Sequence, residues 1–231
     1  MAEQLSNQTT GGGSNPTPPL QFSRCTLKDV SQFVKTYHYS RSHPGGVDFS
    51  FGVYQDQTLV GAALFGHIAG NPMAACVLRT YNDPKKYREL MRLVLLDEVP
   101  KMTESKFVGW CIRELKKKTD LLALISFADP KFGHVGTVYQ AGNWIYTGLQ
   151  KPDRDRIFID GVERHPKSIY NLYGTSSLPR IRELLPTSQI TTAPREPKHR
   201  YVFVLRPELR SFLKFSAKPY PKALQFGDSL V

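Results

Sequence analysis

The sequence predicts a mixed α/β fold, in which a central sheet is flanked by helices. Two nearly continuous apolar runs, residues 93–96 and 121–127, are typical of strands that are buried on both faces. Between them, apolar residues from Phe107 to Leu115 recur at helical spacing. The distance between the two runs fits a right-handed strand–helix–strand crossover, which joins two parallel neighbours. A chain that is 40% hydrophobic has enough apolar surface to cover such a sheet.

The remaining elements follow from shorter patterns. Leu27, Val30, Phe33 and Val34 predict a first helix over residues 26–37, capped by Thr26 or Ser23. Strands are expected over 49–54 and 59–67, around the hairpin connection 55–58, and near 75–79. A strand is then expected over 89–96, a helix after Pro100 capped by Thr103 or Ser105, and a strand over 121–127. The last expected elements are a short helix or turn within 134–142 and strands over 144–147 and 201–205.

Composition divides the chain into three parts. Residues 1–20 are rich in Ser, Asn, Thr, Gly and Pro, and we expect a disordered N-terminal segment. Residues 21–150 form the predicted catalytic core. Residues 151–231 form a basic extension that we expect to pack on the core and to contact nucleic acid. This extension holds 15 Lys and Arg against 8 Asp and Glu, so it carries most of the net charge of +11.

Other classes of protein are less well supported. No run of 18 apolar residues predicts a membrane span, and the N-terminus does not resemble a secretory signal. Cys25, Cys76 and Cys111 are far apart and odd in number, which favours buried thiols over a disulfide framework.

The segment from Phe127 to Gln140 is the strongest candidate for chemistry. Asp129 follows the carboxyl end of a buried strand, where open α/β sheets place their sites. Asp129 and His134 could act in proton transfer, and Tyr139 could act as a general acid. Each residue also fits a structural role, as an Asp-Pro turn, a surface histidine and a core tyrosine.

Two further segments could contribute to this site. The loop His38-Tyr39-Ser40 could reach it, and His38, Asp129 and His134 would then form a two-His, one-carboxylate set of the kind that holds iron. The loop Lys101–Lys106 opens a helix and could grip a phosphate, but it lacks glycines and carries Glu104, which would repel one. An ordinary capped helix is the alternative reading of this loop.

Longer strings of residues give a resemblance. The stretches 92–100, 103–110 and above all 126–146 resemble the Mom family, the DNA-modification proteins of Mu-like bacteriophages. The resemblance covers nearly the whole ordered chain. It implies a GNAT-like acyltransferase core that converts adenine in double-stranded DNA to its carbamoylmethyl derivative, in the cytoplasm of the infected bacterium, and so protects phage DNA from host restriction.

The resemblance also implies site residues. The residues carried over as catalytic are His38, Arg92, Ser105, Asp129 and Tyr139. The residues expected to contact substrate or DNA, from basic and aromatic character or from their place in these segments, are Tyr39, Ser40, Lys106, His134, Tyr146, Arg154, Arg156, Lys198 and Arg200.

The donor stays open between two hypotheses. The loop Lys101–Lys106 departs from the glycine-rich pyrophosphate loop of GNAT enzymes, which disfavours ordinary acetyl-CoA use. A carbamoylmethyl amine is an isomer of a glycyl amide, so an activated glycine such as glycyl-tRNA is one candidate. Acetyl-CoA with a separate nitrogen source is the other. Alternatives to the whole function are transfer to a small-molecule or protein amine, and DNA binding without catalysis.

Overall fold

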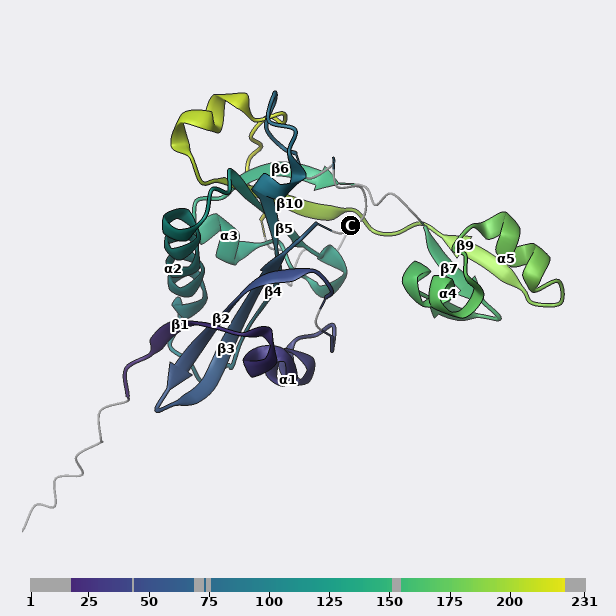
Figure 1. The fold of residues 1–231 in the computed structure, drawn as a ribbon, viewed down its shortest axis with the longest axis horizontal. Coiled ribbons are helices and arrows are strands. Elements are labelled where there is room, and N and C mark those ends of the chain that lie inside the picture. The colour runs from purple at the N-terminus through teal and green to yellow at the C-terminus, as the bar shows by residue number, and fades with distance from the viewer. Residues whose placement is uncertain (1–17, 43, 69–72, 74–75, 151–154, 223–231) are drawn as a thin grey trace, which may run out of the picture.

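The computed structural model describes residues 18–42, 44–68, 73, 76–150 and 155–222. Its main part is a seven-stranded sheet with helices on both faces (Figure 1), so the predicted fold class is confirmed. The strand order is β1-β2-β3-β4-β5-β10-β6, and the β4–β5 pair is parallel while the other pairs are antiparallel. The strands are β1 (Gln21–Cys25), β2 (Val47–Gln55), β3 (Thr58–Gly66), β4 (Tyr87–Leu95), β5 (Ala123–Ala128), β6 (Ile145–Gln150) and β10 (Lys198–Val204).

Successive side chains of β3 pack against different helices, which places the two helical layers on opposite faces of the sheet. Ala62 and Leu64 pack with α1 (Leu27–Tyr37), whereas Ala63 and Phe65 belong to the cluster that contains α2 (Thr103–Lys118). Because successive side chains of a strand point to opposite faces, the two helices cover opposite sides of the sheet. The short helix α3 (Thr137–Ala141) lies on the α2 side, since Tyr139 belongs to the same cluster.

The helix starts show where local sequence decides and where it does not. Thr26 caps α1 as predicted, in a capping box with Asp29. The expected cap of α2 by Thr103 or Ser105 is wrong, because Met102 is the N-cap, with φ of 69° and no capping side chain. Thr103 and Ser105 lie within the first turn, and their hydroxyls donate to the carbonyls of Pro100 and Met102.

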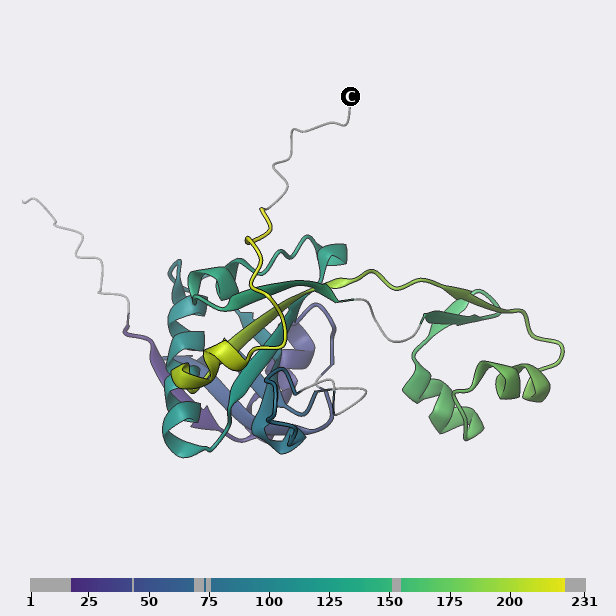
Figure 2. The same cartoon turned by 90° about the horizontal axis from the view of Figure 1, so that it is seen from above.

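A small lobe interrupts the hairpin between β6 and β10. It has its own sheet, ordered β8-β7-β9, and its own core built on Ile157, Ile159, Ile169 and Ile181. Figures 1 and 2 show it standing to one side of the large sheet. Its elements are β7 (Arg156–Ile159), β8 (Val162–Arg164), α4 (Pro166–Tyr173), α5 (Leu178–Leu184) and β9 (Ile190–Ala193).

The chain after β10 runs back over the large sheet. The single-turn helix η4 (Pro207–Phe212) lies beside residues 76–79, where Leu78 and Leu213 form one isolated bridge. The strand expected near 75–79 is therefore wrong for Cys76–Arg79, since that segment pairs with the C-terminal tail at one position and not with the sheet. Farther on, Lys218 N–H donates to the carbonyl of Tyr146 on the edge strand β6 (2.8 Å).

No helix within the described parts of the chain is long and apolar enough to cross a membrane.

Candidate functional site

The site lies where the parallel strands β4 and β5 stop pairing. Their ladder covers only Tyr87–Glu89 against Ala123–Ile125, although both strands continue beyond it. At the first position past the ladder, the hydroxyl of Ser126 donates to the carbonyl of Leu90 (3.0 Å). A side chain thus takes the place of a backbone hydrogen bond, and the carboxyl ends of the two strands are free to diverge.

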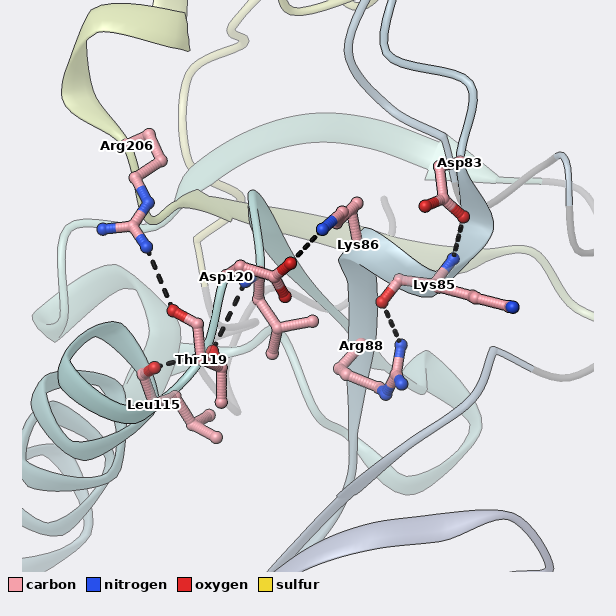
Figure 3. A network of polar contacts seen from close by, with 9 residues as sticks. Asp83, Lys85, Lys86, Arg88, Leu115, Thr119, Asp120 and Arg206 are labelled. Carbon is pink, nitrogen blue, oxygen red and sulfur yellow. Dashed lines mark hydrogen bonds and ion pairs between the residues drawn. The ribbon is translucent and has the colours of Figure 1, made fainter.

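Polar contacts lock the opposite end of the same strand pair (Figure 3). Lys86, next to the start of β4 in the turn η2 (Pro84–Lys86), is ion-paired with Asp120, which precedes β5. Arg206 donates to the carbonyl of Thr119 (3.0 Å), and the hydroxyl of Thr119 donates to the carbonyl of Leu115 at the end of α2 (2.7 Å). This end is closed, so the divergence is confined to the end that carries the candidate residues.

Asp129 organises the turn that follows β5. Its carboxylate accepts the N–H of Lys131 (3.1 Å) and is ion-paired with the ammonium of Lys198 (2.9 Å). Its carbonyl accepts the N–H of Phe132 (3.1 Å) and of His134 (3.3 Å). The turn η3 (Pro130–Phe132) ends at Gly133, whose φ of +72° favours glycine. Asp129 therefore fixes the geometry of the whole segment and keeps a carboxylate at the end of β5.

His38 follows α1 and is buried at the inner end of its loop. Its Nδ1 accepts the N–H of Ser40 (3.1 Å), so the proton of the neutral ring lies on Nε2. Burial, together with the charges of Arg92 and His134, lowers the pKa of His38 to about 4. At neutral pH this imidazole is uncharged and offers Nε2–H as a hydrogen-bond donor.

Arg92 on β4 supplies a positive charge next to His38. Its Nε donates to the carbonyl of Ser42 (3.1 Å), and its Nη1 donates to the carbonyl of Met91 (2.7 Å). Burial lowers the pKa of Arg92, while Tyr39 and Glu89 act in the opposite direction. A half-buried guanidinium beside a neutral imidazole is suited to stabilise negative charge on a substrate oxygen.

Tyr139 lies on the other side of the strand pair, on α3. Its hydroxyl is hydrogen-bonded to Ser126, the residue that ends the β4–β5 ladder. Burial is the main cause that raises the pKa of Tyr139 to about 12, against the lowering effect of the Ser126 hydrogen bond and with smaller contributions from Tyr39, Glu89 and Glu104. The phenol therefore stays protonated and acts as a donor. Its ring packs against Trp144 and Tyr201, with centroids 5.3 and 5.2 Å away.

The structure thus brings several expected residues together. The rings of His38 and Tyr39 are 4.2 Å apart, and Tyr39 is 5.6 Å from His134. Arg92 lies close enough to His38 for its charge to lower the pKa of His38, and Tyr39 contributes to raising the pKa of Tyr139. The metal alternative is not supported: within the described residues, no group of three or more His, Cys, Asp or Glu side chains could hold a metal ion, and His38, Asp129 and His134 are no exception.

The other expected residues have structural partners or lie elsewhere. The hydroxyl of Ser105 donates within the first turn of α2, and the side chain of Lys106 is exposed there. The hydroxyl of buried Tyr146 is paired with Nδ1 of His199 (2.8 Å). Arg200 donates to Thr147 and Gln150 and lies over the ring of Phe215, at 3.5 Å from its centroid. Arg156 belongs to the small lobe, and Arg154 lies outside the described residues.

Two residues of the site were missed by the sequence analysis. Ser126 looks like one more position of an apolar strand, and only the end of the ladder gives its hydroxyl a role. Phe132 is part of the segment singled out above, but it carries no group that could do chemistry. Only the folded chain shows that 48% of the surface of Phe132 is exposed.

Comparisons with known proteins show the family of this chain. Residues 19–222 match the Mom protein family, and the chain belongs to that family. A relative from Escherichia phage Mu, named methylcarbamoylase mom, is 26% identical over 193 residues, which cover 82% of this chain and 78% of the relative. Since a methylcarbamoylase is a transferase, the predicted enzyme class is confirmed.

Solved structures with a similar fold are named as acetyltransferases. A GNAT-family acetyltransferase from Desulfovibrio desulfuricans gives a TM-score of 0.48 at 8% identity, and covers 81% of this chain and 100% of its own. An N-acetyltransferase from Staphylococcus aureus gives 0.46 at 12% identity, with 81% and 98% covered. An acetyltransferase from Bacillus subtilis in complex with CoA gives 0.42 at 11% identity, with 80% and 99% covered.

Proposed function

We propose that this chain modifies adenine in double-stranded DNA, by transfer to the exocyclic amine that ends as N6-carbamoylmethyladenine. The observation that carries the proposal is the placement of Asp129 at the end of β5, of Arg92 and His38 beside each other, and of Tyr139 next to Ser126 where the β4–β5 ladder ends, in a chain of the Mom family. The site of action is the cytoplasm of an infected bacterium, where the modified phage DNA resists host restriction.

The basic residues support a DNA substrate. Residues 198–222 hold seven Lys and Arg against one Glu. Two of these cations, Lys218 and Lys222, are exposed on the part of the tail that runs beside β6, whereas Arg210 and Lys214 are exposed near residues 76–82, at the closed end of the strand pair. Exposed cations release counterions when they contact phosphates, so this tail is suited to hold a duplex near the site.

Each site residue then has a role that fits its geometry. The adenine amine is a weak nucleophile, so Asp129 orients it and accepts its proton as the new N–C bond forms. Arg92 and Nε2–H of His38 stabilise the negative charge that develops on the donor's carbonyl oxygen. The hydroxyl of Tyr139 donates a proton to the leaving oxygen as the bond between carbonyl carbon and leaving group breaks.

The donor in this proposal is an activated glycyl ester, with glycyl-tRNA as the candidate. A glycyl amide on N6 and a carbamoylmethyl group on N6 are isomers, so rearrangement after transfer needs no further reactant. The first turn of α2 supports this choice over acetyl-CoA, because it presents exposed Glu104 and no glycine where a pyrophosphate would have to lie. Cells fed isotopically labelled glycine should yield labelled modified adenine, and an unlabelled product would point to acetyl-CoA and a separate nitrogen source.

The function itself is tested by mass spectrometry of nucleosides from cells that express the chain. Wild type should produce carbamoylmethyladenine, and Asp129→Asn should reduce it by at least about 100-fold, the usual contribution of a proton-transfer group. Asp155→Asn, an exposed carboxylate of the small lobe, is the matched control and should have no effect. If the DNA stays unmodified but the chain binds it in a salt-sensitive way, a non-catalytic DNA-binding protein is favoured. If the DNA stays unmodified and no specific binding is found, a small-molecule or protein amine is favoured as the substrate.

A further inference from the structure

Two large aromatic rings are exposed side by side at the rim of the site. Tyr39 and Phe132 each have 48% of their surface exposed, and their ring centroids are 4.5 Å apart. Folding normally covers large apolar side chains, and neighbouring exposed ones mark a surface that binds something. These two residues come from different elements, since Tyr39 follows α1 and Phe132 ends the turn after β5.

The exposed position of Phe132 is built into the fold. Its N–H donates to the carbonyl of Asp129 (3.1 Å), and the next residue, Gly133, turns the chain with a positive φ while its N–H donates to Pro130 (2.9 Å). The carboxylate of Asp129 closes the same turn through Lys131. Three hydrogen bonds therefore fix the backbone of this turn, and the ring of Phe132 is exposed at a fixed turn.

The ring series leads from solvent into the site. Phe132 contacts Tyr39, Tyr39 stacks on buried His38 at 4.2 Å, and His134 lies 5.6 Å from Tyr39. Cations border the series, because Lys131 is exposed and Lys198 is held at the turn by Asp129. Apolar rings bordered by cations fit the chemistry of nucleic acid, whose bases stack and whose phosphates are anionic.

We propose that Phe132, supported from behind by Tyr39, is a wedge that enters the base stack of duplex DNA where the target adenine leaves it. This inference rests on the proposed function. An adenine amine inside a duplex cannot reach Asp129, so the base has to be extruded, at the cost of its stacking and pairing. Phe132 has no polar atom to satisfy, and a ring inserted between base steps restores stacking in the gap that the adenine leaves.

A binding experiment tests the wedge without any donor. The probes are two duplexes from a plasmid sequence that wild type modifies, one fully paired and one with an abasic site opposite the target adenine. In the second duplex the adenine is already unpaired, so its extrusion costs less free energy and a wedge contributes less to binding. Phe132→Ala should weaken binding to the paired duplex by about tenfold and binding to the abasic duplex by no more than about twofold, while Phe132→Trp should bind like wild type.

A second readout follows the base itself. With 2-aminopurine in place of the target adenine, wild type should raise the fluorescence of the paired duplex as the base leaves the stack, and Phe132→Ala should abolish most of this rise. Tyr170→Ala removes a still more exposed ring from the small lobe (58% exposed, against 48% for Phe132) and should leave both readouts unchanged. Circular dichroism checks that the variants are folded.

The outcomes separate the wedge from the function. Equal loss on both duplexes would make Phe132 an ordinary contact and overturn the wedge, as would the absence of any loss. If wild type modifies adenine in cells while either result is found, the proposed function stands and the wedge alone is wrong. If wild type modifies no DNA, the proposed function is wrong, and the wedge, which rests on it, is wrong as well.

Discussion

The large-sheet part and the small lobe are two differently built regions of one chain. The large sheet is covered on both faces, and the proposed site lies at the point where β4 and β5 separate. The lobe, residues 155–197, has an independent core of isoleucines and is inserted in the hairpin between β6 and β10. We therefore expect the proposed reaction to take place on the large sheet and changes in the lobe to leave the proposed site intact.

Charge separates the two regions as clearly as packing does. The lobe holds six Lys and Arg against five Asp and Glu, whereas residues 198–222 hold seven against one. The lobe also contains a cavity of about 600 Å³ whose lining is uncharged apart from Asp155. The positive excess of the C-terminal third is therefore located on β10 and the tail of the large-sheet part, and attraction of phosphates by the lobe is weak by comparison.

The strongest test of this comparison removes one hydroxyl from each region. Tyr139→Phe should lower DNA modification by about 100-fold, because it removes the proton donor and the contact with Ser126. Tyr173→Phe in the lobe, where the ring packs on the isoleucine core, should leave modification within about twofold of wild type, as expected for a group outside the reaction. Modified adenine is measured by mass spectrometry. Equal losses in both variants would show that the lobe takes part in catalysis.

A cavity in the lobe should destabilise the lobe alone. Ile169 is fully buried there, so Ile169→Ala should lower the free energy of unfolding of the lobe by about 2–5 kcal/mol. Amide hydrogen exchange should then accelerate in β7 and α4 while the amides of β3 and β5 keep wild-type rates. Accelerated exchange throughout the chain would mean that the two regions unfold as one unit. Leu124→Ala in the large sheet is the control and should accelerate exchange there.

A smaller loss should follow when the tail is detached from the site. The Nε2 of Gln140 lies within 3.0–3.1 Å of the carbonyl of Val135, the hydroxyl of Tyr201 and the carbonyl of Pro221, so it joins the turn before α3 to the tail. Gln140→Leu should lower modification by about tenfold through misplacement of Tyr139, without loss of the fold. Gln189→Leu, which is exposed in the lobe, should have no effect. A wild-type rate of modification for Gln140→Leu would show that the contact of the tail with Gln140 has no role in the reaction.

The smallest expected effect concerns pH and stability. Burial lowers the pKa of His38 to about 4 from an ordinary 6.5, so between these values the unfolded chain binds a proton that the folded chain does not. This residue therefore lowers stability as pH falls from about 6.5 to 4 and has no effect on the pH dependence above 6.5. The free energy of unfolding, measured with urea, should differ less between pH 5 and pH 7 for His38→Asn than for wild type. An unchanged difference would contradict a buried, neutral His38.

Local patterns were sufficient for the elements that repeat a simple period. Apolar periodicity predicted α1, α2 and the strands β2 to β5, because the burial of one face leaves a regular trace in the sequence. The start of α2 at Met102 was missed because a residue in the left-handed region has no side-chain signature. The segment 76–79 was mistaken for a strand because its apolar residues are covered by the tail, which lies more than 130 positions later.

By itself, the sequence determined the fold class, the family and the placement of Asp129 at the end of a buried strand, since these depend on patterns within short stretches. Only the tertiary structure decided which side chains meet there. The hydrogen bond of Ser126 to Leu90 past the end of the β4–β5 ladder, the ion pair of Asp129 with Lys198 and the exposed pair of Tyr39 and Phe132 each join residues from distant segments. No local period records such contacts, because they arise from the way whole elements pack.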